Sequence, residues 1–257
     1  MSVLETYLTE LRDIRATGAG VKETSYYPAL AALLNEVGTA LKPKVHCVLQ
    51  LANRGAGSPD GGLFTQDQFK QADRGAVLLG QTPSRGVVEV KGTGDDAWVT
   101  ADSHQVSKYW SKYRQVLVTN YRDFVLVGQD QSGNAVKLET YRLADGEADF
   151  WAKAAHARAF ARQHDAPVTE FLYRVMLHAA PLAEPKDVAW FLASYARTAK
   201  TRIEGQDLPA LAAVRSALEE ALGLKFEGEK GEHFFRSTFV QTLFYGIFSA
   251  WVLWSKT

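Results

Sequence analysis

Apolar residues follow two different spacings along the first half of the chain. Residues 4–14 and 25–41 carry them three or four positions apart, which predicts helices. Short apolar runs bounded by Gly, Pro, Asn or Asp predict strands, and these runs cover 45–51, 61–65, 85–91, 115–119, 124–129 and 135–143. A further helix is expected over 100–113, between the third and fourth strands. Strands interleaved with helices predict an α/β fold with a mixed central sheet flanked by helices.

The second half of the chain has a different pattern, because the strand signal stops near residue 146. Helical spacing continues over 147–163, 169–178, 186–203 and 208–222, and an apolar helix ends the chain. We therefore expect a first domain over 1–145, followed by an all-helical connector domain over 146–257.

The last predicted helix contains no charged residue from Ser237 to Ser255. A run of this length is typical either of a membrane-spanning helix or of a helix surrounded by other elements. Thr238, Gln241 and Ser249 recur within it, which favours the surrounded helix and no membrane contact. Such an apolar terminal helix leads us to expect that the sequence is the N-terminal part of a longer polypeptide.

Composition narrows the classes of protein that fit the chain. The 257 residues include 29 Lys and Arg against 29 Asp and Glu, and 46% are hydrophobic. These values exclude a disordered chain and a polycationic nucleic-acid binder, although a basic cleft offset by acidic surface is still allowed. Cys47 is the single cysteine, so an internal disulfide is excluded and a reducing compartment is favoured. The N-terminus carries no secretory signal pattern, which also favours the cytoplasm.

Three polar residues stand at the ends of predicted strands. Asp60 follows Pro59 directly before one strand, and Glu89 and Lys91 end a later apolar strand. Residues two apart in a strand point to the same face, so Glu89 and Lys91 project together. Asp60 and Glu89 would then converge on one Mg²⁺, with Mn²⁺ as a substitute, because carboxylate oxygens suit such cations. Lys91 would position the attacking water, whereas the alternative is a solvated Glu–Lys pair beside a turn aspartate.

The residues Pro59-Asp60 and Glu89-x-Lys91, in this order on strands, resemble the motif of the PD-(D/E)xK nuclease superfamily. The resemblance implies a restriction-endonuclease-like fold in which Asp60 and Glu89 bind the metal and Lys91 positions the nucleophile. It also implies an acid near an earlier helix that supports a metal or a water. That acid would be Glu23, with Glu36 as the alternative.

The helix after the lysine strand carries a second part of the resemblance. Gln105 and Tyr109 are four positions apart and share a helix face, and some branches of the superfamily have a Q-x-x-x-Y element here. The resemblance implies that both residues face the metal site and the DNA strand, with Gln105 in the catalytic set and Tyr109 in contact with DNA. The loop 92–97 is expected to be flexible. Basic residues that would contact phosphates if they cluster are Lys42, Lys44, Arg54, Lys108, Lys112, Arg114 and Arg122.

A narrower resemblance covers nearly the whole chain. Stretches 23–28, 54–64, 86–92, 119–124, 227–233 and 241–246 look like the N-terminal region of bacterial restriction–modification polypeptides. In those, a nuclease domain is followed by a helical connector and an adenine methyltransferase. The chain itself carries no N/D-P-P-Y/F tetrapeptide and no glycine motif of a methyltransferase.

This resemblance implies a bacterial, cytoplasmic, Mg²⁺-dependent restriction endonuclease that acts in phage defence. It cuts double-stranded DNA by attack of a metal-activated water. The implied partners are downstream methyltransferase and target-recognition domains of the same polypeptide. The sequence leaves open whether double-strand cutting needs dimerisation. The alternative function is a non-cleaving DNA-binding or assembly module with a nuclease-like fold, and a membrane anchor over 239–254 is a third.

Overall fold

The computed structural model describes residues 1–21, 23–53, 55–70, 78, 80–178, 180–181, 184–204, 206 and 208–256. The chain forms two compact units, Met1–Pro181 and Leu182–Thr257.

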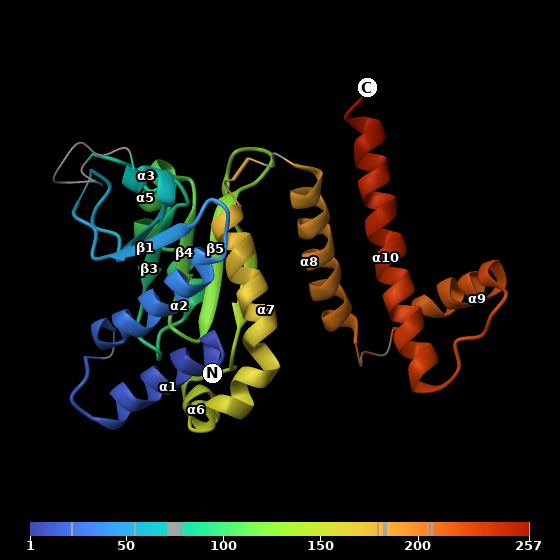
Figure 1. Ribbon diagram of the computed structural model, residues 1–257, viewed down its shortest axis with the longest axis horizontal. Helices are drawn as coiled ribbons and strands as arrows, with labels where there is room; N and C mark the ends of the chain where they lie inside the picture. Colours follow the sequence, from blue (N-terminus) through green and yellow to red (C-terminus); the bar gives the residue numbers. More distant parts are fainter. Residues whose placement is uncertain are drawn as a thin grey trace. The chain divides into compact units, whose positions relative to one another are not determined.

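The first unit is built on a six-stranded sheet in which spatial order follows chain order (Figure 1). The strands are β1 (Val45–Leu49), β2 (Gly61–Thr65), β3 (Val87–Val90), β4 (Val116–Thr119), β5 (Asp123–Gln129) and β6 (Ala135–Arg142). Only the β3–β4 pair is parallel, and the other four pairs are antiparallel. A parallel pair needs a crossover, and α4 (Ala97–Ala101) and α5 (His104–Tyr113) supply it. The predicted mixed sheet flanked by helices is therefore confirmed.

Helices cover the two faces of this sheet unequally. The larger core joins one face to α1 (Val3–Ala16), α2 (Tyr27–Thr39), α6 (Glu147–Ala154) and α7 (Ala157–Leu177). The smaller core packs α4 and α5 on the other face. A 3₁₀ turn, η1 (Thr24–Tyr26), leads into α2, and a short α3 (Gln66–Lys70) follows β2. Strand β3 contributes Val88 to the larger core and Val87 to the smaller one, as expected for a central strand.

The first unit extends beyond the expected boundary near residue 145. Helices α6 and α7 pack on α1 and α2 through buried residues such as Phe150 and Phe171, so they belong to the sheet unit. Helix α7 also continues through Pro167, where the sequence predicts a break. Proline usually interrupts a helix interior, but burial of Val168 and Phe171 against the core holds the helix together. The break falls instead at Ala155–His156.

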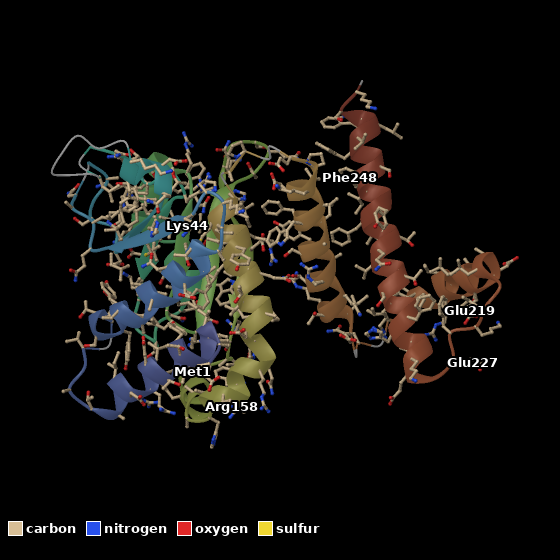
Figure 2. The ribbon with its side chains drawn as sticks, viewed as in Figure 1. Met1, Lys44, Arg158, Glu219, Glu227 and Phe248 are labelled. Carbon is tan, nitrogen blue, oxygen red and sulfur yellow. The ribbon has the colours of Figure 1, made fainter. Side chains whose placement is uncertain are left out.

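The second unit consists of α8 (Pro185–Ile203), α9 (Leu211–Leu222) and α10 (Gly228–Trp254), as the helical pattern predicts. Helices α8 and α10 line a cavity of about 860 Å³, and Phe248 of α10 is one of its apolar walls (Figure 2). The expected burial of the terminal helix is not observed, because Tyr245 and Trp254 are 71% and 74% exposed. No helix in the described part of the chain is long and apolar enough to cross a membrane.

Candidate active site

The end of strand β3 brings a glutamate and a lysine together. Glu89 lies on the same face of the strand as Val87, whose side chain belongs to the core beneath α5. The Lys91 Nζ donates to Glu89 Oε1 at 2.6 Å, as the i, i+2 spacing predicts. Glu89 is only 1% exposed, whereas the Lys91 side chain is 31% exposed. The pair is therefore not a solvated surface pair, because its carboxylate is buried.

Asp60 is tied to the same strand from the neighbouring loop. Its Oδ2 accepts a hydrogen bond from the backbone N–H of Val90 at 2.8 Å, between the two residues of the pair. Its Oδ1 accepts from the Tyr27 hydroxyl at 2.7 Å. The antiparallel pairing of β1, β2 and β3 carries Asp60 to this position, because β2 starts at the next residue. The structure thus brings Asp60, Glu89 and Lys91 into one cluster.

The charges of this cluster depend on one another. Burial raises the pKa of Glu89 to about 7; the Lys91 hydrogen bond opposes this rise and the nearby Asp60 carboxylate adds to it. Burial alone would lower the pKa of Lys91, but the carboxylates of Glu89, Asp60 and Glu23 outweigh burial and raise it. Lys91 is thus fully charged at neutral pH, while Glu89 exchanges its proton there.

One oxygen of the cluster accepts no hydrogen bond. Glu89 Oε2 is buried and no described residue donates to it, although Glu89 in its protonated form can itself donate to the Asp60 carboxylate. A buried acceptor without a partner is costly, and a bound cation is one way to satisfy it. No group of three or more His, Cys, Asp or Glu side chains in the described residues is arranged to hold a metal. The cluster therefore offers two carboxylates, which matches Mg²⁺ sites that are completed by water and substrate phosphate.

Glu23 lies at the edge of the cluster and is connected to it through Tyr27. The Tyr27 hydroxyl is 3.4 Å from Glu23 Oε1 as well as hydrogen-bonded to Asp60. The buried Tyr121 hydroxyl donates to the backbone carbonyl of Glu23. Glu36, the alternative acid, is exposed on α2. Sequence reasoning missed Tyr27, although it follows Glu23 by four residues, the spacing that joins side chains across one helical turn.

Helix α5 lies against the loop that leads to Asp60. The Gln105 Nε2 donates to the Tyr109 hydroxyl at 3.0 Å, which joins the two residues that the sequence pairs. Gly57 has a φ of 107°, and a Cβ added there would lie 3.1 Å from Tyr109 Cε1, so both the backbone and the close approach to the ring favour glycine. Burial raises the pKa of Tyr109; Gln105 opposes the rise, and the carboxylates of Glu89 and Asp60 add to it. Tyr109 is thus near the cluster, but it is only 2% exposed.

The expected basic contacts differ in their placement. Lys108 and Lys112 are both exposed on α5, and the Lys112 Nζ lies 3.6 Å from the position of a Cβ at Gly55 in the same loop. Arg54 lies outside the described residues.

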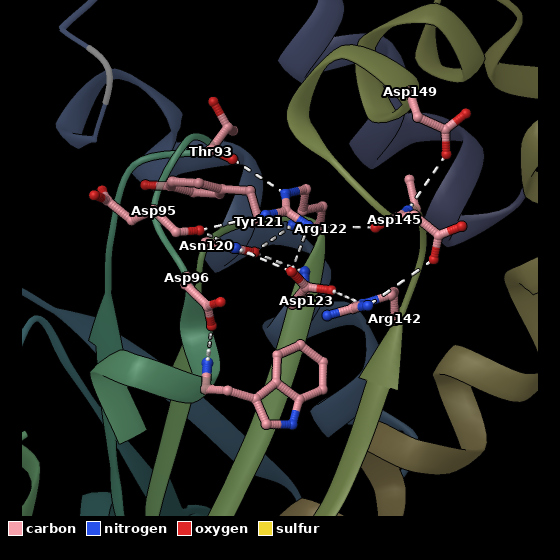
Figure 3. A network of polar contacts seen from close by, with 12 residues as sticks. Thr93, Asp95, Asp96, Asn120, Tyr121, Arg122, Asp123, Arg142, Asp145 and Asp149 are labelled. Atoms are coloured by element: carbon pink, nitrogen blue, oxygen red, sulfur yellow. Dashed lines mark hydrogen bonds and ion pairs between the residues drawn. The ribbon is translucent and has the colours of Figure 1, made fainter. Parts of the chain in front are cut away.

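Arg122 is not available for a phosphate, because it belongs to a buried network (Figure 3). It is 8% exposed and its Nη1 lies 2.6 Å from Oδ2 of the buried Asp123. Its Nε donates to the carbonyl of Thr93 at 3.1 Å, and Asn120 Nδ2 donates to the carbonyl of Asp95 at 2.7 Å. The loop expected to be flexible is therefore held by side chains that follow β4.

Comparison with known proteins gives matches in structure alone. The sequence matches no protein-family model and none of the curated proteins. The fold is similar to a chain of a DrdV–DNA complex, with a TM-score of 0.40 and 19% identity, over 62% of this chain and 94% of that one. It is also similar to the type IIG restriction endonuclease BpuSI, with a TM-score of 0.35 and 12% identity, over 81% of this chain. The match spans only 23% of the BpuSI chain.

Proposed function

We propose that the first unit is a metal-dependent DNA endonuclease domain of the restriction type, which hydrolyses phosphodiester bonds. One observation carries this proposal. Asp60, Glu89 and Lys91 meet in a single cluster whose glutamate is buried with an oxygen to which no described residue donates. A structural ion pair would satisfy its buried oxygens, whereas a site for a cation and a phosphate has to keep a position open.

The residues of the cluster have separate tasks in this proposal. Asp60 and Glu89 would hold Mg²⁺, or Mn²⁺ in its place, and the bound ion supplies positive charge and a water acidic enough to attack. Tyr27 and the Val90 N–H hold the Asp60 carboxylate in its orientation.

Lys91 lies where its task requires a cation. Its charged Nζ is partly exposed and pairs with one Glu89 oxygen. From there it can donate to an attacking water or to a phosphate oxygen as negative charge develops. Glu23 would support a second water or ion at the edge. Gln105 would line the path of the strand, and the buried Tyr109 would position it by accepting its hydrogen bond instead of contacting DNA directly. Lys108, Lys112 and Arg54 would contact phosphates.

The wider assignment rests on the resemblance of the sequence to restriction–modification polypeptides. It makes double-stranded DNA the substrate and gives target recognition and adenine methylation to further domains of the same polypeptide. Dimerisation for double-strand cutting belongs to the same proposal, as do a role in phage defence and a bacterial cytoplasmic location.

The test is plasmid cleavage with Mg²⁺ or Mn²⁺ by the wild-type chain and by Lys91→Ala. We expect the variant to lose at least about 100-fold in rate, as when one preorganised donor is removed from an active site. Lys137→Ala is the matched control, because Lys137 pairs with the exposed Asp102 away from the cluster. Cleavage by Lys91→Ala at the wild-type rate would contradict the assignment.

The alternative is a non-cleaving DNA-binding module, and the Lys91–Glu89 ion pair favours it, because the pair already occupies the lysine. That function requires salt-sensitive DNA binding without metal-dependent cutting by the wild-type chain.

A further inference from the structure

Helices α1 and α7 line an open concave site in the first unit, on the face of the sheet opposite α5. The cavity measures about 500 Å³ and is lined by α1 and by the segment that joins α6 to α7. Its polar walls include Arg12, His156, Arg158 and Arg162. We call this site the arginine groove. Figure 2 shows Arg158 at the end of α7 that adjoins α6.

Two arginines of the groove have no counterion. Arg158 and Arg162 are exposed, and neither side chain forms an ion pair or a hydrogen bond within the described residues. Elsewhere in the unit, Arg142 pairs with Asp123 and Arg174 pairs with Glu139, each at 2.9 Å.

Acidic residues only partly compensate for these arginines. Arg12 is 2.7 Å from Asp13, and Glu5 is the one acid that lines the cavity. The groove thus keeps a net positive charge.

Stability does not explain this arrangement. Arg158 and Arg162 are four positions apart on one helix face, where like charges repel. Arg158 stands in the first turn of α7, where the helix dipole disfavours positive charge, and this turn contains no acidic residue. A bound anion would offset both the repulsion between the arginines and the unfavourable interaction with the helix dipole.

Helix α6 connects the arginine groove to the segment that follows the candidate active site. Its first residue, Glu147, accepts a hydrogen bond from Thr93 at 2.7 Å, and Thr93 lies two residues after Lys91. The other end of α6 leads into the arginine groove.

We infer that the arginine groove binds the phosphate backbone of the duplex DNA that the unit cuts, an inference that rests on the proposed function. Guanidinium groups match phosphate oxygens with two parallel hydrogen bonds. The arginines come from two helices and are spread along an open groove. This arrangement suits an extended chain of phosphates better than a single small anion. The groove positions the duplex and reads no sequence.

The experiment measures binding of a labelled 20-base-pair duplex to the full chain in EDTA, so that no cutting occurs. Wild type is compared with Arg158→Ala/Arg162→Ala over a range of salt concentrations. We expect the slope of log affinity against log salt to fall by about 2, because each lost phosphate contact removes about 0.9. The loss should be the same for duplexes of unrelated sequence. Arg202→Ala/Lys230→Ala removes two exposed charges from α8 and α10 and should leave the slope unchanged.

Each outcome decides the inference. An unchanged slope in the arginine variant overturns it but leaves the cleavage proposal intact, because that proposal is tested separately through Lys91. An equal loss in the control variant also overturns it, since the effect would then be one of total charge. Lost binding of inorganic phosphate with unchanged DNA binding would assign the groove to a small anion instead. The arginine variant should melt no lower than wild type, which separates lost contacts from lost folding.

Discussion

The buried Glu89 carboxylate should make the stability of the metal-free protein fall as pH rises. Its pKa is about 7 in the folded chain against 4.5 for an ordinary glutamate. Replacing Glu89 by Gln keeps the shape and removes the charge at every pH. The difference in unfolding free energy between wild type and Glu89→Gln therefore isolates the cost of ionising this one side chain.

The sign and size follow from proton linkage. Between pH 4.5 and 7 the folded state holds a proton on Glu89 that the unfolded state has lost, so wild type loses stability relative to the variant as pH rises. Above pH 7, wild type has lost all of this stability relative to Glu89→Gln. A shift from 4.5 to about 7 corresponds to about 3 kcal/mol. For a chain of this size that equals a relative fall of about 6–12 °C in melting temperature.

The assay is thermal or urea unfolding in EDTA at several pH values from 4.5 to 8.5, followed by tryptophan fluorescence. Glu36→Gln, which removes an exposed glutamate of α2, controls for the loss of one charge and should track wild type. Adding Mn²⁺ at pH 8 should restabilise wild type and not Glu89→Gln, because only the ionised carboxylate binds the ion. Parallel curves for wild type and Glu89→Gln across the whole pH range would refute the reasoning.

Two other substitutions test how the cluster and its support are held. Tyr27→Phe removes the hydrogen bond to Asp60 Oδ1 and should slow plasmid cleavage about tenfold while costing about 1 kcal/mol of stability in unfolding; an unchanged cleavage rate would show that Tyr27 does not orient Asp60. Asp123→Asn leaves two arginines without their buried counterion and should destabilise the unit by about 3–5 kcal/mol in urea unfolding. A cost below about 1 kcal/mol would contradict the buried ion pairing.

The sequence pattern predicts the contact between Glu89 and Lys91, but it does not predict the contacts that surround this pair. Glu89 and Lys91 meet because a strand has a period of two, and this period can be read from one sequence. The bond between Asp60 and the Val90 N–H depends on strand register across β2 and β3, which no local pattern encodes. The sequence around Arg122 is that of an ordinary surface arginine. Its role in holding the fold follows from the burial of Asp123, with which it forms an ion pair.

Domain limits were harder to predict for a similar reason. Local propensity places a helix break at Pro167, but the packing of α7 on α1 and α2 outweighs one lost backbone hydrogen bond. The same packing draws α6 and α7 into the sheet unit, past the composition change near residue 146. Burial against residues distant in the sequence determines both the continuity of α7 and the limit of the first unit. A local sequence pattern does not encode such long-range contacts.

The buried carboxylates of Asp123 and Glu89 differ in how completely they are paired, and this difference bears on function. Asp123 has both oxygens engaged, by Arg122 at 2.6 Å and by Arg142 at 2.9 Å. Glu89 is equally buried at 1% exposure, yet no described residue donates a hydrogen bond to its Oε2, and among the described residues the cation that pairs with it is a lysine with access to solvent. A buried acceptor left unpaired costs about 1–3 kcal/mol, which the chain could recover with a second arginine, as it does at Asp123. The protein thus pairs its structural carboxylate completely and leaves this one incomplete, which is the arrangement that a site for an external cation requires.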